Sequence, residues 1–488
     1  MGSSRITQRG ANFFHLNRNI QLAFVQSFFS SIGTGIMWGI LPVFIVEITG
    51  SIVLLGLITT AAGVASTLIL FPCGFLADYW RRDGLIIIGG FLAAIGTFLV
   101  VIANSFEALL FAQVIIGLSQ GLFGSPIEAL IADSTETGLR SKIYSQLYFV
   151  RSFFSAVGPF FGVFLALLLG DYWGVEVLRS LLFFGAIIWF FGFISTLFMR
   201  DSRALGKESE SENTDPLQHT KNQIAQSSFK VPIIIVISGI IIGFGAGMTV
   251  QYFPLFFKDE VFPGYGLRPT QWYLILGTAQ IVSGFVGILA QRVSKRIGRV
   301  ETMFSFQGIA VLALIMIIPN PIWGFLGTIS GFPAWAIIPP LLPVIFLFIF
   351  RNAFMNASNP LSRTIVMDKI AKRHRGKWNA LEQLAWGFLW SFSAGIGGLI
   401  VEGWGYYVCF TITSTLYTIA TLMILLIRKD VLKERDVVED QVFTPETPKR
   451  HRLFRTAMHW ETSLKILSSR EGNSSQSRTE KDSRKWEN

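Results

Sequence analysis

The sequence predicts an all-α integral membrane protein whose twelve transmembrane helices form two pseudo-symmetric six-helix bundles. Three observations predict this class. Of the 488 residues, 51% are hydrophobic and only 15% are charged, whereas a soluble domain carries about 25% charged residues. Twelve apolar segments approach or exceed the roughly 20 residues that a helix needs to cross the hydrocarbon core. Two short motifs also recur, in the same order, in the two halves of the chain.

The duplicated motifs indicate that the two halves are related. The first motif occurs as Gly33-x-Gly35-x6-Pro42-Val43-Phe44 and again as Gly245-x-Gly247-x6-Pro254-Leu255-Phe256. The second occurs as Asp133-x6-Arg140-Ser141-Lys142 and again as Asp368-x6-Arg375-Gly376-Lys377. Internal repeats of this kind are typical of membrane carriers. The repeats therefore predict two bundles of the same design.

The predicted spans follow one another with short connections, except for a polar interruption after the sixth. They are Ile20–Glu47, Ile52–Ala77, Leu85–Ala103, Ala108–Ala132, Ile143–Leu169, Leu178–Met199, Val231–Phe257, Trp272–Ala290, Met303–Ile318, Ile337–Met367, Trp378–Val401 and Tyr407–Ile427. A polar, Arg-bearing start runs directly into the first span, so we expect no cleavable signal peptide. Cys73 and Cys409 lie within apolar runs, and we expect them to be packing residues with no disulfide or metal site.

The connections between spans alternate in charge. Basic residues gather near residues 81–82, 140–142, 200–230, 292–299 and 369–377, whereas the other connections hold only Arg179, Lys258 and Arg268. By the positive-inside rule, both termini and the central loop are predicted to be cytoplasmic, in a membrane that the sequence does not identify. The net charge of +10 then reflects topology and contact with membrane lipids, and we expect no nucleic-acid partner.

Composition divides the chain into four regions. Residues 1–200 form the N-terminal bundle, 201–229 a cytoplasmic linker loop, 230–428 the C-terminal bundle, and 429–488 a polar cytoplasmic tail. Within the tail, five apolar residues fall on one helical face: Leu453, Ala457, Trp460, Leu464 and Leu467. This pattern is typical of an amphipathic helix lying on the membrane. The alternative is a disordered tail with scattered apolar residues.

The connection between the second and third spans carries a family signature. It reads Gly74-Phe75-Leu76-Ala77-Asp78-Tyr79-Trp80-Arg81-Arg82 and resembles the G-x-L-A-D-R-x-G-R-K signature of the major facilitator superfamily, with Arg81 replacing the usual glycine. The resemblance extends over residues 18–428 and implies secondary transport by two six-helix halves around a central site. It also implies that Asp78 latches the cytoplasmic ends of the halves. The alternative is a carboxylate that only caps a helix.

A second signature lies in the fifth span. Gly158, Pro159 and Gly162 resemble the core of the G-x-x-x-G-P-x-x-G-G pattern of proton-coupled drug exporters, although Phe154 and Val163 replace its outer glycines. The proline removes a helix hydrogen bond and the glycines permit close approach, so the alternative is a kinked packing face. Gln113 stands where the fourth-helix signature of these exporters has an arginine, which argues against proton antiport.

Several spans carry polar side chains along one helical face. These faces are expected to line a central cavity or, as an alternative, to join helices. Arg351 lies about fourteen residues into its span, about 20 Å deep at 1.5 Å per residue. It predicts an anionic or carbonyl-bearing ligand group, unless it caps backbone carbonyls at a broken helix. The candidate cavity residues are Gln26, Gln113, Gln120, Arg151, Gln251, Gln280, Arg351, Asn352 and Asn356.

Charged residues near the predicted cytoplasmic face suggest two symmetry-related ion pairs. Glu128 and Arg151 would form one pair, and Arg363 and Glu382 the other, with the signs exchanged between the halves. The candidate residues for a conformational latch and its ion pairs are Gly74, Asp78, Arg82, Glu128, Asp133, Arg140, Arg363, Asp368, Arg375 and Glu382.

These features favour a secondary transporter that moves a small organic solute by alternating access, with export as one direction. The alternatives are an organic-anion uniporter or symporter, and a transporter-like receptor or scaffold acting through the tail. No enzyme activity, metal or cofactor is expected, because all five histidines lie outside the spans. The expected partners are a small-molecule substrate and membrane lipids. A coupling proton or ion remains open, and we expect a monomer.

Overall fold

A computed structural model of the chain describes residues 16–79, 81–135, 140–201, 230–259, 265–323, 339–369 and 375–428. These belong to one compact unit, Met1–Arg428, and the predicted tail helix lies outside the described residues. Within the described part, eleven helices are long and apolar enough to cross a membrane. A further long helix, Arg375–Trp404, lies between the last two of them. The predicted all-α membrane class is confirmed.

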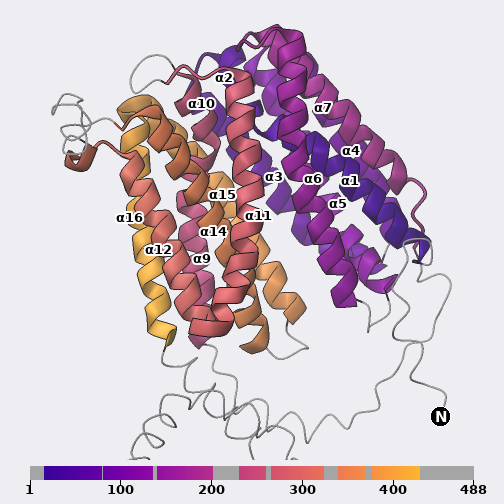
Figure 1. The fold of residues 1–488 in the computed structure, drawn as a ribbon. Helices are drawn as coiled ribbons and strands as arrows, with labels where there is room; N and C mark the ends of the chain where they lie inside the picture. The colour runs from indigo at the N-terminus through magenta and orange to yellow at the C-terminus, as the bar shows by residue number, and fades with distance from the viewer. Residues whose placement is uncertain are drawn as a thin grey trace, which may run out of the picture. The chain divides into compact units, whose positions relative to one another are not determined.

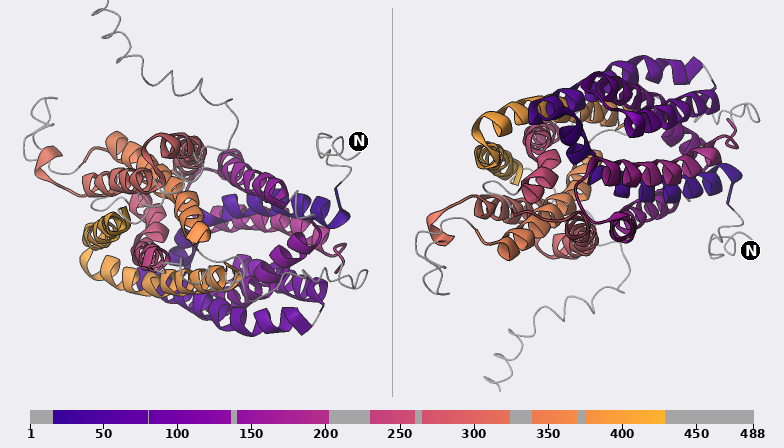
Figure 2. Two further views of the ribbon diagram at one scale, coloured as in Figure 1. Left: turned by 90° about the horizontal axis from the view of Figure 1, so that it is seen from below. Right: turned by 90° about the horizontal axis from the view of Figure 1, so that it is seen from above.

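The helices of the two halves lie side by side in the compact unit (Figures 1 and 2). The first half contains α1 (Arg18–Trp38), α2 (Leu41–Thr49), α3 (Ile52–Tyr79), α4 (Arg82–Ile102), α5 (Phe106–Asp133), α6 (Arg140–Leu169) and α7 (Val175–Thr196). The second half contains α9 (Lys230–Thr249), η4 (Val250–Tyr252), α10 (Phe253–Lys258), α11 (Pro269–Ile297), α12 (Arg299–Ile317), α14 (Leu341–Lys369), α15 (Arg375–Trp404), α16 (Tyr406–Met423) and η6 (Ile424–Ile427).

The first predicted span of each half is a broken helix. In the first half, α1 ends at Trp38 and α2 begins at Leu41, with Pro42 in its first turn. In the second half, the 3₁₀ turn η4 separates α9 from α10, which has Pro254 in its first turn. A proline has no N–H for the preceding turn, so it favours the start of a helix and disfavours its interior. The prolines of the duplicated motif therefore mark equivalent breaks.

The glycines of the same motif let the first helix of each half pack closely on its neighbours. A Cβ on Gly33 would lie 2.7 Å from the carbonyl oxygen of Gly185 in α7, and one on Gly35 would lie 2.7 Å from that of Ser155 in α6. In the second half, a Cβ on Gly247 would lie 2.0 Å from the carbonyl oxygen of Trp390 in α15. These distances leave no room for a side chain, so the duplicated glycines fix equivalent crossings.

Replacing Gly247 by alanine is expected to destabilise the second half by about 1–3 kcal/mol, because the added methyl group overpacks a backbone contact. Gly239 is a matched control on the same helix, since nothing lies within 4 Å of a Cβ built there. Both changes raise helix propensity equally, so Gly239→Ala should leave the melting temperature unchanged or raise it. Melting curves of both variants in detergent check this. Equal melting temperatures would contradict the assigned crossing.

The halves contact each other along two equivalent seams, α3 with α15 and α6 with α11. Each seam joins the second long helix of one half to the fifth of the other. Small residues bring the helices together: the Thr60 hydroxyl donates to the Ser391 carbonyl at 2.8 Å, and Gly162 lies against the Tyr273 ring. Both seams therefore depend on side chains small enough for close helix contact.

The two ends of the unit differ. We call the end that carries Glu47, Asp171, Lys258 and Glu402 the closed end, because polar contacts join the halves there. The opposite end, where α1 begins and α7 ends, is called the linker end. In Figure 1 the ribbons of the two halves converge near α2 and α10 and diverge toward the linker end.

Candidate functional site

A cavity of about 490 Å³ lies between the halves, beside the breaks in their first helices. Both halves line it: α1, α2, α3, α4, α5 and α7 on one side, and η4, α10, α11, α14 and α15 on the other. Four tryptophans contribute much of the apolar wall: Trp38, Trp189, Trp272 and Trp390. Among the described lining residues, Arg351 is the only charged one, and none has a carboxylate.

Arg351 lies at the cavity wall and is buried, with 2% of the residue exposed. Its Nη2 donates a hydrogen bond to the Tyr417 hydroxyl at 2.8 Å. The guanidinium carbon lies 5.5 Å from the centre of the Phe253 ring and 5.6 Å from that of Tyr417, within the range of cation–π attraction. Its Nε has no hydrogen-bond partner in the described structure. The hydrogen bond found for Arg351 goes to a hydroxyl group, and not to the backbone carbonyls that a helix-capping role would involve.

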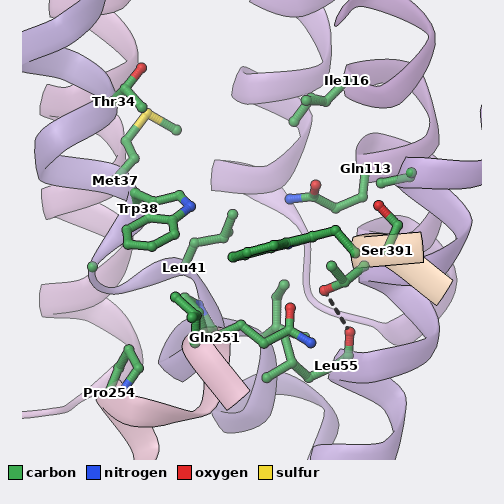
Figure 3. Close-up of a pocket in the computed structure, with 18 of the residues that line it drawn as sticks. Thr34, Met37, Trp38, Leu41, Leu55, Gln113, Ile116, Gln251, Pro254 and Ser391 are labelled. Carbon is green, nitrogen blue, oxygen red and sulfur yellow. Dashed lines mark hydrogen bonds between the residues drawn. The ribbon is translucent and has the colours of Figure 1, made fainter. Parts of the chain in front are cut away.

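Polar amides share the cavity with this arginine. Gln113 is 8% exposed, and its Nε2 has no hydrogen-bond partner in the described structure. Gln120, Gln251 and Asn352 also line the cavity. Figure 3 shows the amides of Gln113 and Gln251 directed toward the cavity from opposite sides. Five of the nine predicted cavity residues thus lie together: Gln113, Gln120, Gln251, Arg351 and Asn352.

The other four predicted cavity residues do not line this cavity. The Gln26 amide donates to Ser30 on its own helix, and Arg151 is held by Glu128 and Ser27. Gln280 is half-buried on α11, and Asn356 is exposed on α14. Sequence spacing assigns these residues to a helical face, but the rotation of that face depends on packing.

A second cavity of about 290 Å³ continues from the first. The two share Gly63, Gln120, Trp390 and Ser391, and the second adds Ser66, Thr67, Trp386 and Gly387. These four additions lie on the linker-end side of the shared residues, because α3 runs toward that end and α15 runs away from it. The cavity system therefore extends from the helix breaks along the α3–α15 seam toward the linker end.

Ion pairs at the linker end connect helices within the first half. Glu128 and Arg151 form one at 2.8 Å, and Arg82 forms another with Asp133. The Arg82 backbone N–H also donates to Asp201 at 3.1 Å. The side chains of Glu128 and Arg151 are 43% and 40% exposed, so their pair contributes at most about 1 kcal/mol. These contacts tie α4, α5 and α6 together, and their role in a latch remains a prediction.

The other predicted latch residues are less completely described. Gly74 lies within α3, and Arg363 is exposed on α14. The side chains of Asp78, Arg140, Asp368, Arg375 and Glu382 lie outside the described part of the structure. The second proposed ion pair therefore stays a prediction.

The predicted kink motif lies at two different contacts. Pro159 is inside α6, and a Cβ on Gly158 would lie 2.5 Å from the Ile32 carbonyl oxygen in α1. A Cβ on Gly162 would lie 2.8 Å from the Tyr273 ring in α11. The motif therefore packs within the first half through Gly158 and across the halves through Gly162.

Two carboxylates at the closed end form contacts that sequence reasoning missed. Asp171 follows α6 and accepts from the Thr270 N–H at 2.9 Å and hydroxyl at 2.8 Å, at the start of α11. Glu402 near the end of α15 accepts from the Ser51 hydroxyl at 2.6 Å and the Val53 N–H at 2.8 Å, at the start of α3. Each carboxylate thus caps a helix of the other half, where its charge favours the helix dipole. An ion pair between Glu47 and Lys258 joins the same end.

Comparison with known proteins gives a consistent family assignment. The sequence model of the Major Facilitator Superfamily matches residues 23–343 and 321–469. The protein named Quinolone resistance protein NorA, from Staphylococcus aureus strains Mu50 / ATCC 700699 and N315, is 25% identical over 249 residues. That alignment covers 50% of this chain and 60% of the relative, so the match spans less than two thirds of the relative's length.

Solved structures share the fold at low sequence identity. The nucleoside transporter NupG has a TM-score of 0.61 at 15% identity, covering 84% of this chain and 99% of that one. A bacterial homologue of the iron transporter ferroportin has a TM-score of 0.63 at 12% identity, covering 84% and 98%. A D-xylose-proton symporter has a TM-score of 0.61 at 15% identity, covering 83% and 95%.

Proposed function

The chain belongs to the Major Facilitator Superfamily, and on that premise we propose that it is a secondary transporter that moves a small organic solute by alternating access. The observation that carries the proposal is the cavity between the halves, which continues toward the linker end while polar contacts join the halves at the closed end. A cavity that both halves line can change its exposure when the halves rotate about it.

The two carboxylate caps supply the closed end with contacts that can break. Asp171 and Glu402 each hold a helix of the other half through hydrogen bonds, which can break and form again. Opening this end requires both caps and the Glu47–Lys258 pair to separate. Because the caps occupy equivalent positions in the repeat, we infer that they open together in the step that exposes the cavity there.

We propose that the linker end faces the cytoplasm and that the physiological direction is export. The orientation rests on basic residues at the linker end, of which the structure describes Arg81, Arg82, Arg292, Lys295, Arg296 and Arg299. The direction rests on the Gly158–Pro159 motif and on a relative that is named for resistance to quinolones. With this orientation, the described structure is inward-facing, and a solute would enter the cavity from the cytoplasm.

Reconstitution into proteoliposomes tests the transport proposal. We expect saturable flux of at least one member of a panel of aromatic acids, amines and neutral amides, measured with and without a pH gradient. Protein-free liposomes provide the leak rate. Flux that never exceeds this leak for any panel member, with protein that still melts cooperatively, would contradict the proposal.

A further inference from the structure

The central cavity holds buried donors that the protein itself leaves unused. Arg351 Nε and Gln113 Nε2 have no hydrogen-bond partner in the described structure, and both residues are at least nine-tenths buried. They belong to different halves, Gln113 to α5 and Arg351 to α14, and they line the same cavity. A buried donor without a partner is costly, so such groups indicate a ligand that supplies acceptors.

The charge of the cavity restricts this ligand further. Arg351 carries the only charge among the described lining residues, and a hydroxyl and two aromatic faces are its observed contacts. A guanidinium has five N–H donors in a planar fork, and Tyr417 uses one of them. A buried charge is stabilised most by a hydrogen-bonded partner of opposite sign. The geometry of the fork matches a carboxylate.

The walls favour a flat, apolar body for the same ligand. Trp38, Trp189, Trp272 and Trp390 line the cavity together with Phe253 and Phe348. Aromatic side chains stack on planar rings and bury large apolar areas. The volume of about 490 Å³ is within the range of small-molecule sites.

We propose that the solute is a planar aromatic carboxylate, with its acid group at Arg351 and its ring among the tryptophans. Gln113 supplies a further donor to the same ligand. The proposal deepens the transport function proposed above and rests on it, because the binding cavity is taken to be the translocation site.

Equilibrium binding to the purified full-length chain tests this assignment. Isothermal titration calorimetry is carried out with three acid–amide pairs, and the two members of each pair have the same ring. The pairs are benzoate and benzamide, 1-naphthoate and 1-naphthamide, and 2-naphthoate and 2-naphthamide. At least one acid should bind about tenfold or more tightly than its own amide, as expected for one hydrogen-bonded charge. Arg351→Gln should abolish this preference, and Arg351→Lys should retain part of it, since the charge remains but the fork is lost.

Further variants and melting curves distinguish effects on binding from effects on folding. Gln113→Leu should weaken the acid and its amide alike, because the lost amide donor can serve either carbonyl group. Arg292→Gln and Gln291→Leu remove the same groups from exposed positions on α11, and both should leave binding unchanged. Melting curves without ligand identify any Arg351 variant that fails to fold, in which case Gln113→Leu and the wild-type acid–amide comparison decide.

The proposal is overturned if none of the acids binds more tightly than its amide, or if a folded Arg351→Gln protein keeps the preference. A flux assay separates this failure from failure of the transport function. If an acid binds in an Arg351-dependent way but no flux is detected, the transport proposal is overturned and the site assignment stands. Flux of a neutral solute that is equal in wild type and Arg351→Gln, with no acid preference in the binding measurement, would overturn the site assignment and leave the transport proposal standing.

Discussion

Replacing Gly63 by alanine is expected to reduce solute flux about tenfold or more and to lower the melting temperature. A Cβ on Gly63 would lie 1.9 Å from the Ser391 Cβ and 1.7 Å from its hydroxyl oxygen, across the α3–α15 seam. Rotating the serine side chain moves the hydroxyl but not the Cβ, so the helices themselves must separate. Overpacking of this kind costs about 1–3 kcal/mol, and here it separates the two halves.

A compensating change makes this prediction specific. Ser391→Gly removes both close atoms and leaves the Ser391 Cα position at 3.4 Å from the new methyl group. The double variant should therefore recover much of the flux and stability that Gly63→Ala loses. Gly287→Ala on α11 is the control, because a Cβ there meets nothing within 4 Å and Gly287 is not among the described residues that line either cavity. Absence of any recovery in the double variant would show that the two residues do not face each other.

Removing both carboxylate caps, by Asp171→Asn with Glu402→Gln, is expected to shift the protein toward opening at its closed end. Each change keeps the shape of the side chain but removes the charge that favours the capped helix. Each cap joins the halves, so the loss should appear as greater access at the closed end and not as unfolding. Thr59 on α3 lines the central cavity. Labelling of a cysteine placed there, by a thiol reagent applied from the closed end, should become faster by several fold.

The same contact predicts a pH dependence. Two hydrogen bonds hold the pKa of Glu402 below its ordinary value of 4.5. The bond from the Ser51 hydroxyl has the larger effect and the bond from the Val53 N–H the smaller one. Glu402 lies one residue beyond the predicted span Trp378–Val401. The pKa of Glu402 is lower when the closed end is closed. The ionised carboxylate therefore stabilises the closed end fully at neutral pH, and this stabilisation is lost as the pH falls below 4.5 through the lowered pKa. The thiolate fraction of the cysteine falls with pH in every variant, so the wild-type labelling rate is divided by that of the double variant at the same pH. This ratio should rise on acidification, because only the wild type loses a charged cap.

Glu107→Gln provides the control for both measurements. Glu107 is an exposed carboxylate in the first turn of α5, near the same end, and it makes no contact with the other half among the described interactions. Its replacement should leave the labelling rate and its pH dependence unchanged. If it accelerates labelling as much as the cap variants do, the effect is one of general surface charge.

Much of this fold can be predicted from the sequence, because the membrane imposes simple rules. Apolar length determines the spans, and the repeated glycine–proline motif indicates two similar halves. Hydropathy does not resolve the breaks before Pro42 and Pro254, because both sides of each break are equally apolar. The prolines themselves are the signal that would have found them.

The site is less predictable, because it depends on helix rotation and on distant contacts. Arg351 was expected at mid-membrane depth, but its partner Tyr417 lies 66 residues away. Gln113 and Gln280 occupy similar polar stripes in the sequence, yet Gln113 lines the cavity and Gln280 does not. The caps at Asp171 and Glu402 join residues 99 and 349 apart in sequence, and no local pattern reports such a pairing.

The central claim is that the two ends of the cavity open in alternation, and distances between spin labels at each end test it most directly. Cys73 and Cys409 are first replaced by serine. One pair of labels, at Asn104 and Trp404, reports on the closed end. A second pair, at Phe149 and Arg292, reports on the linker end. On removing both carboxylate caps, the closed-end distance should lengthen while the linker-end distance shortens. Distances that lengthen together, or a closed-end distance that changes while the linker end stays fixed, would contradict alternating access.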